Sequence, residues 1–166
     1  AVAYSNRGSD CIDKGDYDQA VADCTEAIRL APELALAYYT RGLAYHSKAD
    51  YDRAIDDYSE SIRLDPDFAP ARGNRGAAYG MKGDHDRAID DCSEALRING
   101  DDLAAYGSRA SAYMQKGNFA EAIADFTEVI RLNPDSDWAL NNLAWLLATS
   151  PDEEHCDGYQ AVQHAI

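Results

Sequence analysis

The side chains of this sequence that could carry out chemistry are few, and the most suggestive group stands near its end. His155, Cys156 and Asp157 follow one another, and His164 comes shortly after them. Imidazole, thiolate and carboxylate groups are all zinc ligands. Their spacing here matches none of the usual zinc patterns, which combine closely spaced pairs of cysteine or histidine. We therefore expect neither a metal site nor another cofactor.

The other three cysteines stand far from this group. Cys11, Cys24 and Cys92 occur among apolar residues at helical spacing. An unpaired cysteine in such a place behaves as a small apolar core residue, so we interpret all three as buried thiols, although Cys11 and Cys24 are near enough in sequence to approach each other. Four cysteines in 166 residues are too few for a disulfide framework. This favours a cytoplasmic location, while export stays open because the sequence does not begin with methionine.

The sequence carries no recognisable catalytic motif. It has no G-x-S-x-G element, no phosphate-binding loop and no pattern that would join serine, histidine and aspartate. A net charge of −15 opposes binding to nucleic acid and to anionic lipid, and it favours basic partners. No stretch of about 18 apolar residues is present. We therefore expect a protein that is not an enzyme and that binds neither nucleic acid nor membranes.

The elements that position these side chains are set by an internal repeat of 34 residues. Counting the first unit as positions 1–34, small residues return at positions 8 and 20 of each unit, and position 11 is tyrosine in the second, third and fourth units. The repeat is clearest in four short segments: GDYDQAV at 15–21, ADYDRAI at 49–55, GDHDRAI at 83–89 and GNFAEAI at 117–123.

Each unit predicts two helices. In the first unit, Tyr4 and Gly8 belong to one apolar stripe with helical spacing, and Ala20 and Ala27 belong to a second. Gly15 stands between the stripes, where it can take the left-handed conformation that ends a helix. A single helix pair buries too little surface to be stable alone, so successive pairs must stack on one another.

The pattern of Tyr4, Gly8, Ala20, Ala27 and Pro32 resembles the tetratricopeptide repeat. The resemblance implies an all-α fold, a right-handed superhelical solenoid of antiparallel helix pairs. We expect one domain with four full repeats and a fifth, altered and truncated one, with these bounds: 1–34, 35–68, 69–102, 103–136 and 137–166.

Position 7 is arginine in four successive units, although the family often has leucine there. A partly buried arginine needs an acidic partner, and acids recur in step at positions 23 and 26. An arginine ladder for a phosphorylated or carboxylate ligand is the functional alternative. We predict instead that each arginine bridges to one of these acids across its own helix pair: Arg7, Arg41, Arg75 and Arg109.

In proteins of this family, the first helix of each repeat lines a concave groove. The residues at the corresponding positions here are nearly uncharged and mix amides with aromatic or apolar side chains, which suits an extended peptide or a partner helix. Arg72 stands outside these positions, at the place of a tyrosine in other units, and could meet an acid on a ligand or a neighbouring aspartate. We expect partner contacts from Asn6, Tyr39, Leu43, Arg72, Asn74, Met81, Ser108, Met114, Asn141, Asn142 and Trp145.

One sub-class of the family grips a C-terminal carboxylate with lysine, asparagine and arginine at five groove positions. Those positions hold no cation in this sequence, whichever unit the motif starts from: Ser5, Ser9, Thr40, Pro70 and Asn74, or Tyr39, Leu43, Asn74, Ala104 and Ser108. The resemblance therefore implies a protein-interaction scaffold that binds a partner segment without this clamp. The alternative function is self-association through exposed ends of the stack, either alone or as part of a larger protein.

Overall fold

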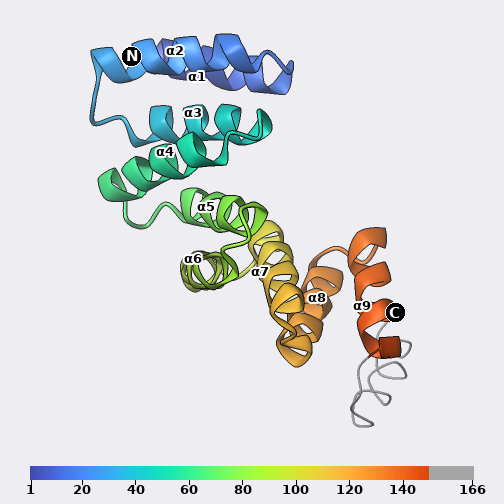
Figure 1. Ribbon diagram of the computed structural model, residues 1–166. Coiled ribbons are helices and arrows are strands. Elements are labelled where there is room, and N and C mark those ends of the chain that lie inside the picture. The colour runs from blue at the N-terminus through green and yellow to red at the C-terminus, as the bar shows by residue number, and fades with distance from the viewer. Residues whose placement is uncertain (150–166) are drawn as a thin grey trace.

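The computed structural model describes residues 1–149, and every regular element in this range is a helix (Figure 1). The all-α class predicted from the sequence is therefore confirmed. The predicted second helix of the fifth repeat lies outside the described residues. The helices are α1 (Val2–Asp13), α2 (Tyr17–Leu30), α3 (Ala35–Ser47), α4 (Tyr51–Leu64), α5 (Ala69–Met81), α6 (His85–Ile98), α7 (Leu103–Lys116), α8 (Phe119–Leu132) and α9 (Asp137–Thr149).

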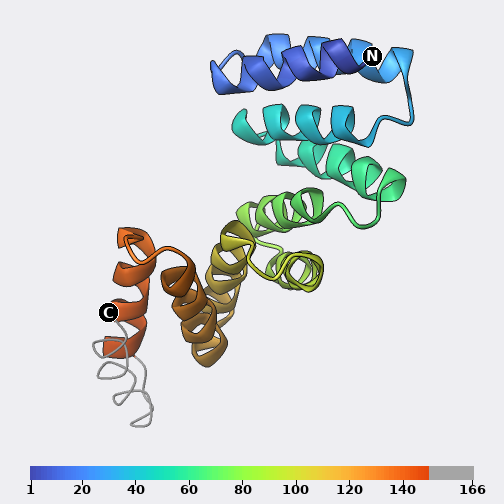
Figure 2. The ribbon, with the colours of Figure 1, turned by 180° about the vertical axis from the view of Figure 1, so that it is seen from behind.

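The helices pair and stack in chain order. Helices α1, α3, α5 and α7 each pack against the even-numbered helix that follows, and each even-numbered helix packs against the odd-numbered helix after it. The odd-numbered helices α1, α3, α5 and α7 also contact one another in succession, so they line one side of the array. The helices α1 to α4 run roughly across the view and α9 stands upright, so the direction of the helices changes along the array (Figures 1 and 2). This is the solenoid of helix pairs that the sequence predicts.

The second helix of each of the first three repeats begins at an aspartate whose side chain satisfies a free backbone N–H. Asp16, Asp50 and Asp84 each accept a hydrogen bond from the amide three residues later, at 3.2, 3.3 and 3.2 Å. Such caps typically contribute about 1 kcal/mol each to helix stability. The repeated aspartate therefore fixes where the second helices start.

Close packing within a repeat depends on glycine at position 8. A Cβ atom on Gly8 would lie 2.6 Å from Sγ of Cys24, and one on Gly76 would lie 2.6 Å from Sγ of Cys92. Both sulfur-bearing side chains are fully buried. In the first and third repeats, the two helices can approach this closely only because position 8 has no side chain, whereas the fourth repeat has the buried Ala110 there.

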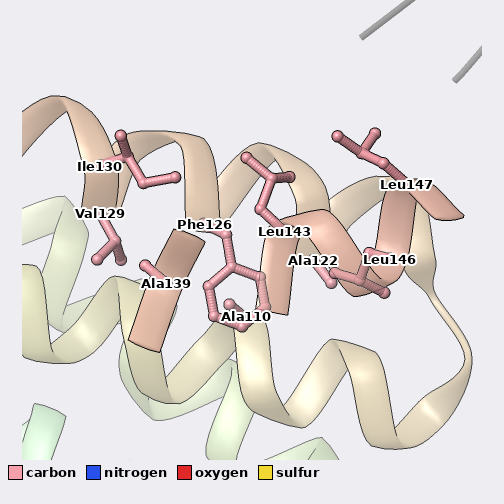
Figure 3. Packing of buried hydrophobic residues seen from close by; sticks show 9 residues of the cluster. All are labelled: Ala110, Ala122, Phe126, Val129, Ile130, Ala139, Leu143, Leu146 and Leu147. Atoms are coloured by element: carbon pink, nitrogen blue, oxygen red, sulfur yellow. The ribbon is translucent and has the colours of Figure 1, made fainter. Parts of the chain in front are cut away.

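The last junction is larger and more apolar than the earlier ones. Phe126 of α8 lies at the centre of a cluster that joins α7, α8 and α9, with Ala110 on one side and Leu143 on another (Figure 3). Position 7 is Leu143 in this repeat, so the arginine of the earlier repeats gives way to apolar packing. Burial of aliphatic and aromatic side chains therefore stabilises the contact of α9 with α7 and α8.

The four arginines at position 7 pair as the sequence predicts. Each one donates two hydrogen bonds to the aspartate sixteen residues later, at position 23 of its own repeat, and the glutamates at position 26 are not the partners. The N–O distances lie between 2.5 and 2.8 Å in the pairs Arg7–Asp23, Arg41–Asp57, Arg75–Asp91 and Arg109–Asp125. The prediction that these arginines are bridged across each helix pair is therefore confirmed.

The outer side of α1 differs from the equivalent side of the later odd-numbered helices. In the second, third and fourth repeats, position 10 is a buried alanine on which the preceding repeat packs: Ala44, Ala78 and Ala112. The first repeat has Asp10 there, and this carboxylate is exposed. Another helix pair docking on α1 in the same way would have to bury that charge, which is costly without a partner.

Candidate binding groove

The predicted contact residues all lie on the odd-numbered helices, which adjoin one another along one side of the array. They are distributed over the whole length of that side. Asn6 is on α1; Tyr39 and Leu43 are on α3; Arg72, Asn74 and Met81 are on α5; Ser108 and Met114 are on α7; Asn141, Asn142 and Trp145 are on α9.

Two of these residues meet at a hollow between α5 and α7. Its volume is about 410 Å³, which is within the range of small-ligand pockets. The floor is low because α5 presents glycine and alanine where larger side chains would fill the space. The lining residues are His46, Ala77, Gly80, Met81, His85, Ser108, Ser111, Ala112 and Gln115.

The two histidines of the hollow come from different repeats. His46 is half-buried and packs edge-on against Tyr51, with ring centroids 5.3 Å apart. Burial lowers the pKa of His46, so this imidazole is neutral at physiological pH. His85 stands at the start of α6, outside the positions from which the sequence predicts groove contacts. His46 therefore adds no positive charge to the hollow at physiological pH.

Tyr39 and Asn74 connect α3 to α5 across the groove. Nδ2 of Asn74 donates to the phenol oxygen of Tyr39 at 3.2 Å and to the carbonyl oxygen of Pro70 at 2.9 Å. The Tyr39 ring packs edge-on against Phe68 at 4.9 Å. Burial raises the pKa of Tyr39, and the nearby charge of Asp102 raises it further. The structure thus brings two predicted contact residues together, and they also hold neighbouring repeats in register.

Of the two alternatives weighed for Arg72, pairing with a neighbouring aspartate is wrong, and contact with an acid on a ligand stays a prediction. Its Nε and Nη2 donate to the carbonyl oxygen of Pro66, at 3.2 and 3.0 Å. No aspartate within residues 1–149 forms an ion pair with it. The local backbone supplies an acceptor six residues earlier, which a pattern of side chains could not reveal.

The groove ends in aromatic residues on α9. Trp138 packs edge-on against Phe126, with centroids 5.2 Å apart, and its ring edge lies 3.2 Å from the place of a Cβ on Gly107. Trp145 is 52 % exposed. Asn142 donates to the carbonyl oxygen of Trp138 at 2.8 Å, and Met114 packs against the apolar cluster around Phe126. Trp138 therefore packs with one edge of its ring although it is 49 % exposed, and Trp145 likewise presents much of its surface to solvent.

Metal and thiol chemistry find little support in the part of the chain that the structure describes. No three histidine, cysteine, aspartate or glutamate side chains of residues 1–149 lie close enough to hold a metal ion. Burial raises the pKa of both the Cys24 and Cys92 thiols to about 12, which makes them poor nucleophiles. The histidines and cysteine of the 155–164 segment lie outside the described range. No helix among the described residues is both long and apolar enough to cross a membrane.

Two family models match the chain. A model described as "Tetratricopeptide repeat" matches residues 35–68, 69–102 and 104–136, and one described as "TPR repeat" matches residues 8–48. The chain belongs to the tetratricopeptide repeat family. The resemblance drawn from the sequence is confirmed, and so is the solenoid fold that it implies. No curated protein matches the sequence.

Solved structures of other tetratricopeptide repeat proteins resemble this one. The first TPR domain of human RPAP3 is 30% identical, covering 70% of this chain and 91% of that one, with a TM-score of 0.66. A first TPR domain of Spaghetti (RPAP3) bound to the HSP90 peptide SRMEEVD is also 30% identical, covering 68% and 89% of the two chains, with a TM-score of 0.66. MamA from Desulfovibrio magneticus RS-1 is 19% identical, covering 98% and 92%, with a TM-score of 0.82. At that identity, MamA supports the fold alone.

Proposed function

We propose that this tetratricopeptide repeat array is a non-catalytic interaction module that holds a segment of a partner protein against its odd-numbered helices. The family mediates protein–protein interactions, and the RPAP3 domain named above carries a bound peptide. The observation that supports the proposal most directly is the hollow of about 410 Å³ between α5 and α7. We place the module in the cytoplasm because its cysteines are few.

The chemistry of the groove favours an extended segment or a helix as the bound element. Met81 is 63 % exposed and supplies an adaptable apolar contact. Ser108 and Gln115 line the same hollow and can donate or accept hydrogen bonds. Amide and hydroxyl groups can pair with the backbone of a peptide, and the space above Gly80 can receive one of its side chains.

The test fills the hollow. Gly80→Met places a large side chain there, and the substitution is sterically mild because a Cβ on Gly80 would meet only Ala88, at 3.8 Å. Gly100→Met is the matched control, because Gly100 is exposed and does not line the hollow. Peptides are selected on the wild-type protein from a random display library, and their Kd values are measured by fluorescence anisotropy.

We expect Gly80→Met to weaken the selected peptides at least about tenfold, which corresponds to about 1.4 kcal/mol. Gly100→Met is expected to leave their Kd unchanged. Equal affinities for both variants, or a library that yields no binder, would count against the groove.

The alternative from the sequence, self-association through the ends of the stack, is less well supported. At the amino-terminal end, the exposed Asp10 replaces the alanine on which each neighbouring repeat packs elsewhere. Sedimentation at several protein concentrations would detect assembly, and a concentration-dependent increase in mass would favour this alternative over a simple binding module.

A further inference from the structure

The hollow between α5 and α7 lies where the third repeat lacks a side chain that other repeats have. Position 12 is Gly80 in the third repeat, whereas the other full repeats have a large residue there: Ile12, His46 and Met114. Position 17 carries a ring in every full repeat: Tyr17, Tyr51, His85 and Phe119. In the second repeat the two positions are in contact, because the His46 ring packs edge-on against Tyr51 with centroids 5.3 Å apart. The His85 ring has no such cover from position 12, and it lines the hollow together with Gly80.

The structure leaves room for a ring beside His85. A Cβ atom on Gly80 would meet only the Cβ of Ala88, at 3.8 Å, and the hollow has a volume of about 410 Å³. Met81 lines the same hollow and is 63 % exposed, and a thioether sulfur contacts aromatic rings favourably. The hollow can therefore hold an aromatic side chain whose edge meets His85, as His46 and Tyr51 meet in the second repeat.

The lining of the hollow contains no aspartate, glutamate, lysine or arginine. A second hollow, which shares His85, has four charged side chains, and they are already engaged in three ion pairs: Lys82 with Asp52, Asp84 with Arg87, and Asp86 with Lys116. A charged group placed in the first hollow would lose water without gaining an opposite charge, which is costly. Charge complementarity thus favours a neutral occupant.

His85 gives the hollow a hydrogen-bonding group. Its Nδ1 is shielded from solvent and has no hydrogen-bond partner among residues 1–149, so Nε2 is the nitrogen left for a ligand. The Ser111 hydroxyl, in contrast, already donates to the carbonyl oxygen of Gly107 at 2.9 Å. A phenol hydroxyl both donates and accepts, so it can bond to Nε2 whichever imidazole nitrogen carries the proton. The hollow therefore suits tyrosine better than phenylalanine.

We propose, on the basis of the function proposed above, that the hollow receives the side chain of a tyrosine in the bound segment. The tyrosine ring lies over Gly80 against Met81, and its hydroxyl bonds to Nε2 of His85. The bound segment thus supplies, from another molecule, the edge contact that position 12 supplies within the second repeat. This site gives the groove a preference for segments that contain tyrosine.

The experiment uses three capped amino acids as probes: N-acetyl-tyrosine amide, N-acetyl-phenylalanine amide and N-acetyl-leucine amide. Isotope-labelled protein is titrated with each probe, and the backbone amide signals of Gly80, Met81 and Ser111 are followed. We expect the tyrosine probe to shift these signals with a Kd of order millimolar. The phenylalanine probe is expected to bind about threefold more weakly, because it lacks the hydrogen bond, and the leucine probe about tenfold more weakly, because it also lacks the ring.

Substitutions copied from other repeats make the test specific. Gly80→His gives position 12 the residue of the second repeat and fills the hollow, whereas Gly100→His adds the same side chain at an exposed residue that does not line it. His85→Phe gives position 17 the residue of the fourth repeat, so it keeps the ring and removes Nε2.

We expect Gly80→His to weaken binding of the tyrosine probe at least about tenfold and Gly100→His to leave it unchanged. In His85→Phe, the tyrosine and phenylalanine probes are expected to bind equally.

Three results would overturn the inference: a leucine probe that binds as tightly as the tyrosine probe, a tyrosine preference that persists in His85→Phe, or no shift at Gly80 with any probe. The proposed function is judged separately, by the comparison of Gly80→Met with Gly100→Met. Library peptides that contain no tyrosine and are weakened by Gly80→Met would support the groove and contradict this selectivity.

Discussion

Arg41 holds Asp57 through two hydrogen bonds of 2.8 Å and reaches back to the hydroxyl of Thr25 in the preceding repeat at 3.1 Å. The same arrangement recurs at the next two junctions, where the hydroxyls belong to Ser59 and Ser93. One guanidinium therefore joins the two helices of its own repeat and also ties that repeat to the one before. Arginine suits this place because its planar fork can satisfy several acceptors at once.

Removing this arginine is expected to be costly. The Asp57 side chain is only 8% exposed and that of Arg41 19%, so Arg41→Ala leaves a buried carboxylate without its partner. We expect a loss of about 3 kcal/mol in the free energy of unfolding, measured with urea. Arg29→Ala is the control, since Arg29 is 66% exposed and pairs with Glu26 on its own helix; there the loss is expected to stay below about 1 kcal/mol. Similar losses in both variants would contradict the structural role of the Arg41 pair.

The same variant should show a distinctive pH dependence. Burial raises the pKa of Asp57 even with Arg41 present, and removal of the arginine strengthens that effect. A carboxyl with a raised folded-state pKa adds stability at low pH and loses it as the pH rises through that pKa. The deficit of Arg41→Ala relative to the wild type should therefore be smaller near pH 4 than near pH 7, as urea unfolding at the two pH values would reveal.

Two glycines of α5 provide a matched comparison of packing. A Cβ on Gly76 would lie 2.6 Å from Cys92 Sγ and 3.1 Å from the Ala88 carbonyl oxygen, whereas one on Gly80 would meet only Ala88 Cβ at 3.8 Å. Gly76→Ala is expected to destabilise the protein by about 1–3 kcal/mol through overpacking. Gly80→Ala should be neutral or stabilising by up to about 1 kcal/mol, because alanine favours the helix. The thermal unfolding midpoints of the Gly76→Ala and Gly80→Ala variants test this expectation. Equal midpoints would contradict the close approach of the helices at Gly76.

The hairpin of the second repeat offers a stabilising substitution. Gly15, Gly83 and Gly117 end first helices in the left-handed conformation, with φ between +77° and +81°, but Ala49 takes φ +58° at the same place. A side chain there costs about 1 kcal/mol or more. Ala49→Gly should therefore raise the free energy of unfolding by up to about 1 kcal/mol, and Gly83→Ala should lower it. A calorimetric melt showing both variants less stable than the wild type would be inconsistent with this backbone geometry.

The buried thiols should be inert until the protein unfolds. The pKa values of Cys24 and Cys92 are raised to about 12 by burial, so almost no thiolate forms at pH 8. In a Cys156→Ser background, a disulfide reagent should react first with the half-buried Cys11, and with the other two only after denaturant is added. Rapid reaction of all three thiols in the native protein would show that the first and third helix pairs open more readily than their packing implies.

Much of the fold could be predicted because the same packing and charge requirements recur in every 34-residue unit. Glycine or alanine returns at position 8 and alanine at position 20 where two helices come close, and the arginine at position 7 returns together with the aspartate at position 23. A charge that recurs in step with an opposite charge predicts a pair. The sequence could not decide between position 23 and position 26, because that choice depends on the rotation of the second helix.

The site was predicted less completely. Its predicted residues lie on the expected helices, but the hollow comes from what Gly80 and Ala77 lack, and its size depends on the separation of α5 and α7. His85 stands at the start of a second helix and so outside the positions from which contacts were predicted. Arg72 donates to a backbone carbonyl oxygen. Every residue has such an acceptor, so the sequence pattern could not predict this partner.

The pairing at Arg7 differs from the others in one respect that bears on how the molecule comes apart. Arg7 holds Asp23, but its side chain is 58% exposed, against about 20% for its three counterparts. This ion pair should therefore be the first of the four to open. Hydrogen–deuterium exchange is expected to be faster in α1 and α2 than in the helix pairs α3–α4 and α5–α6, whose arginines are more deeply buried.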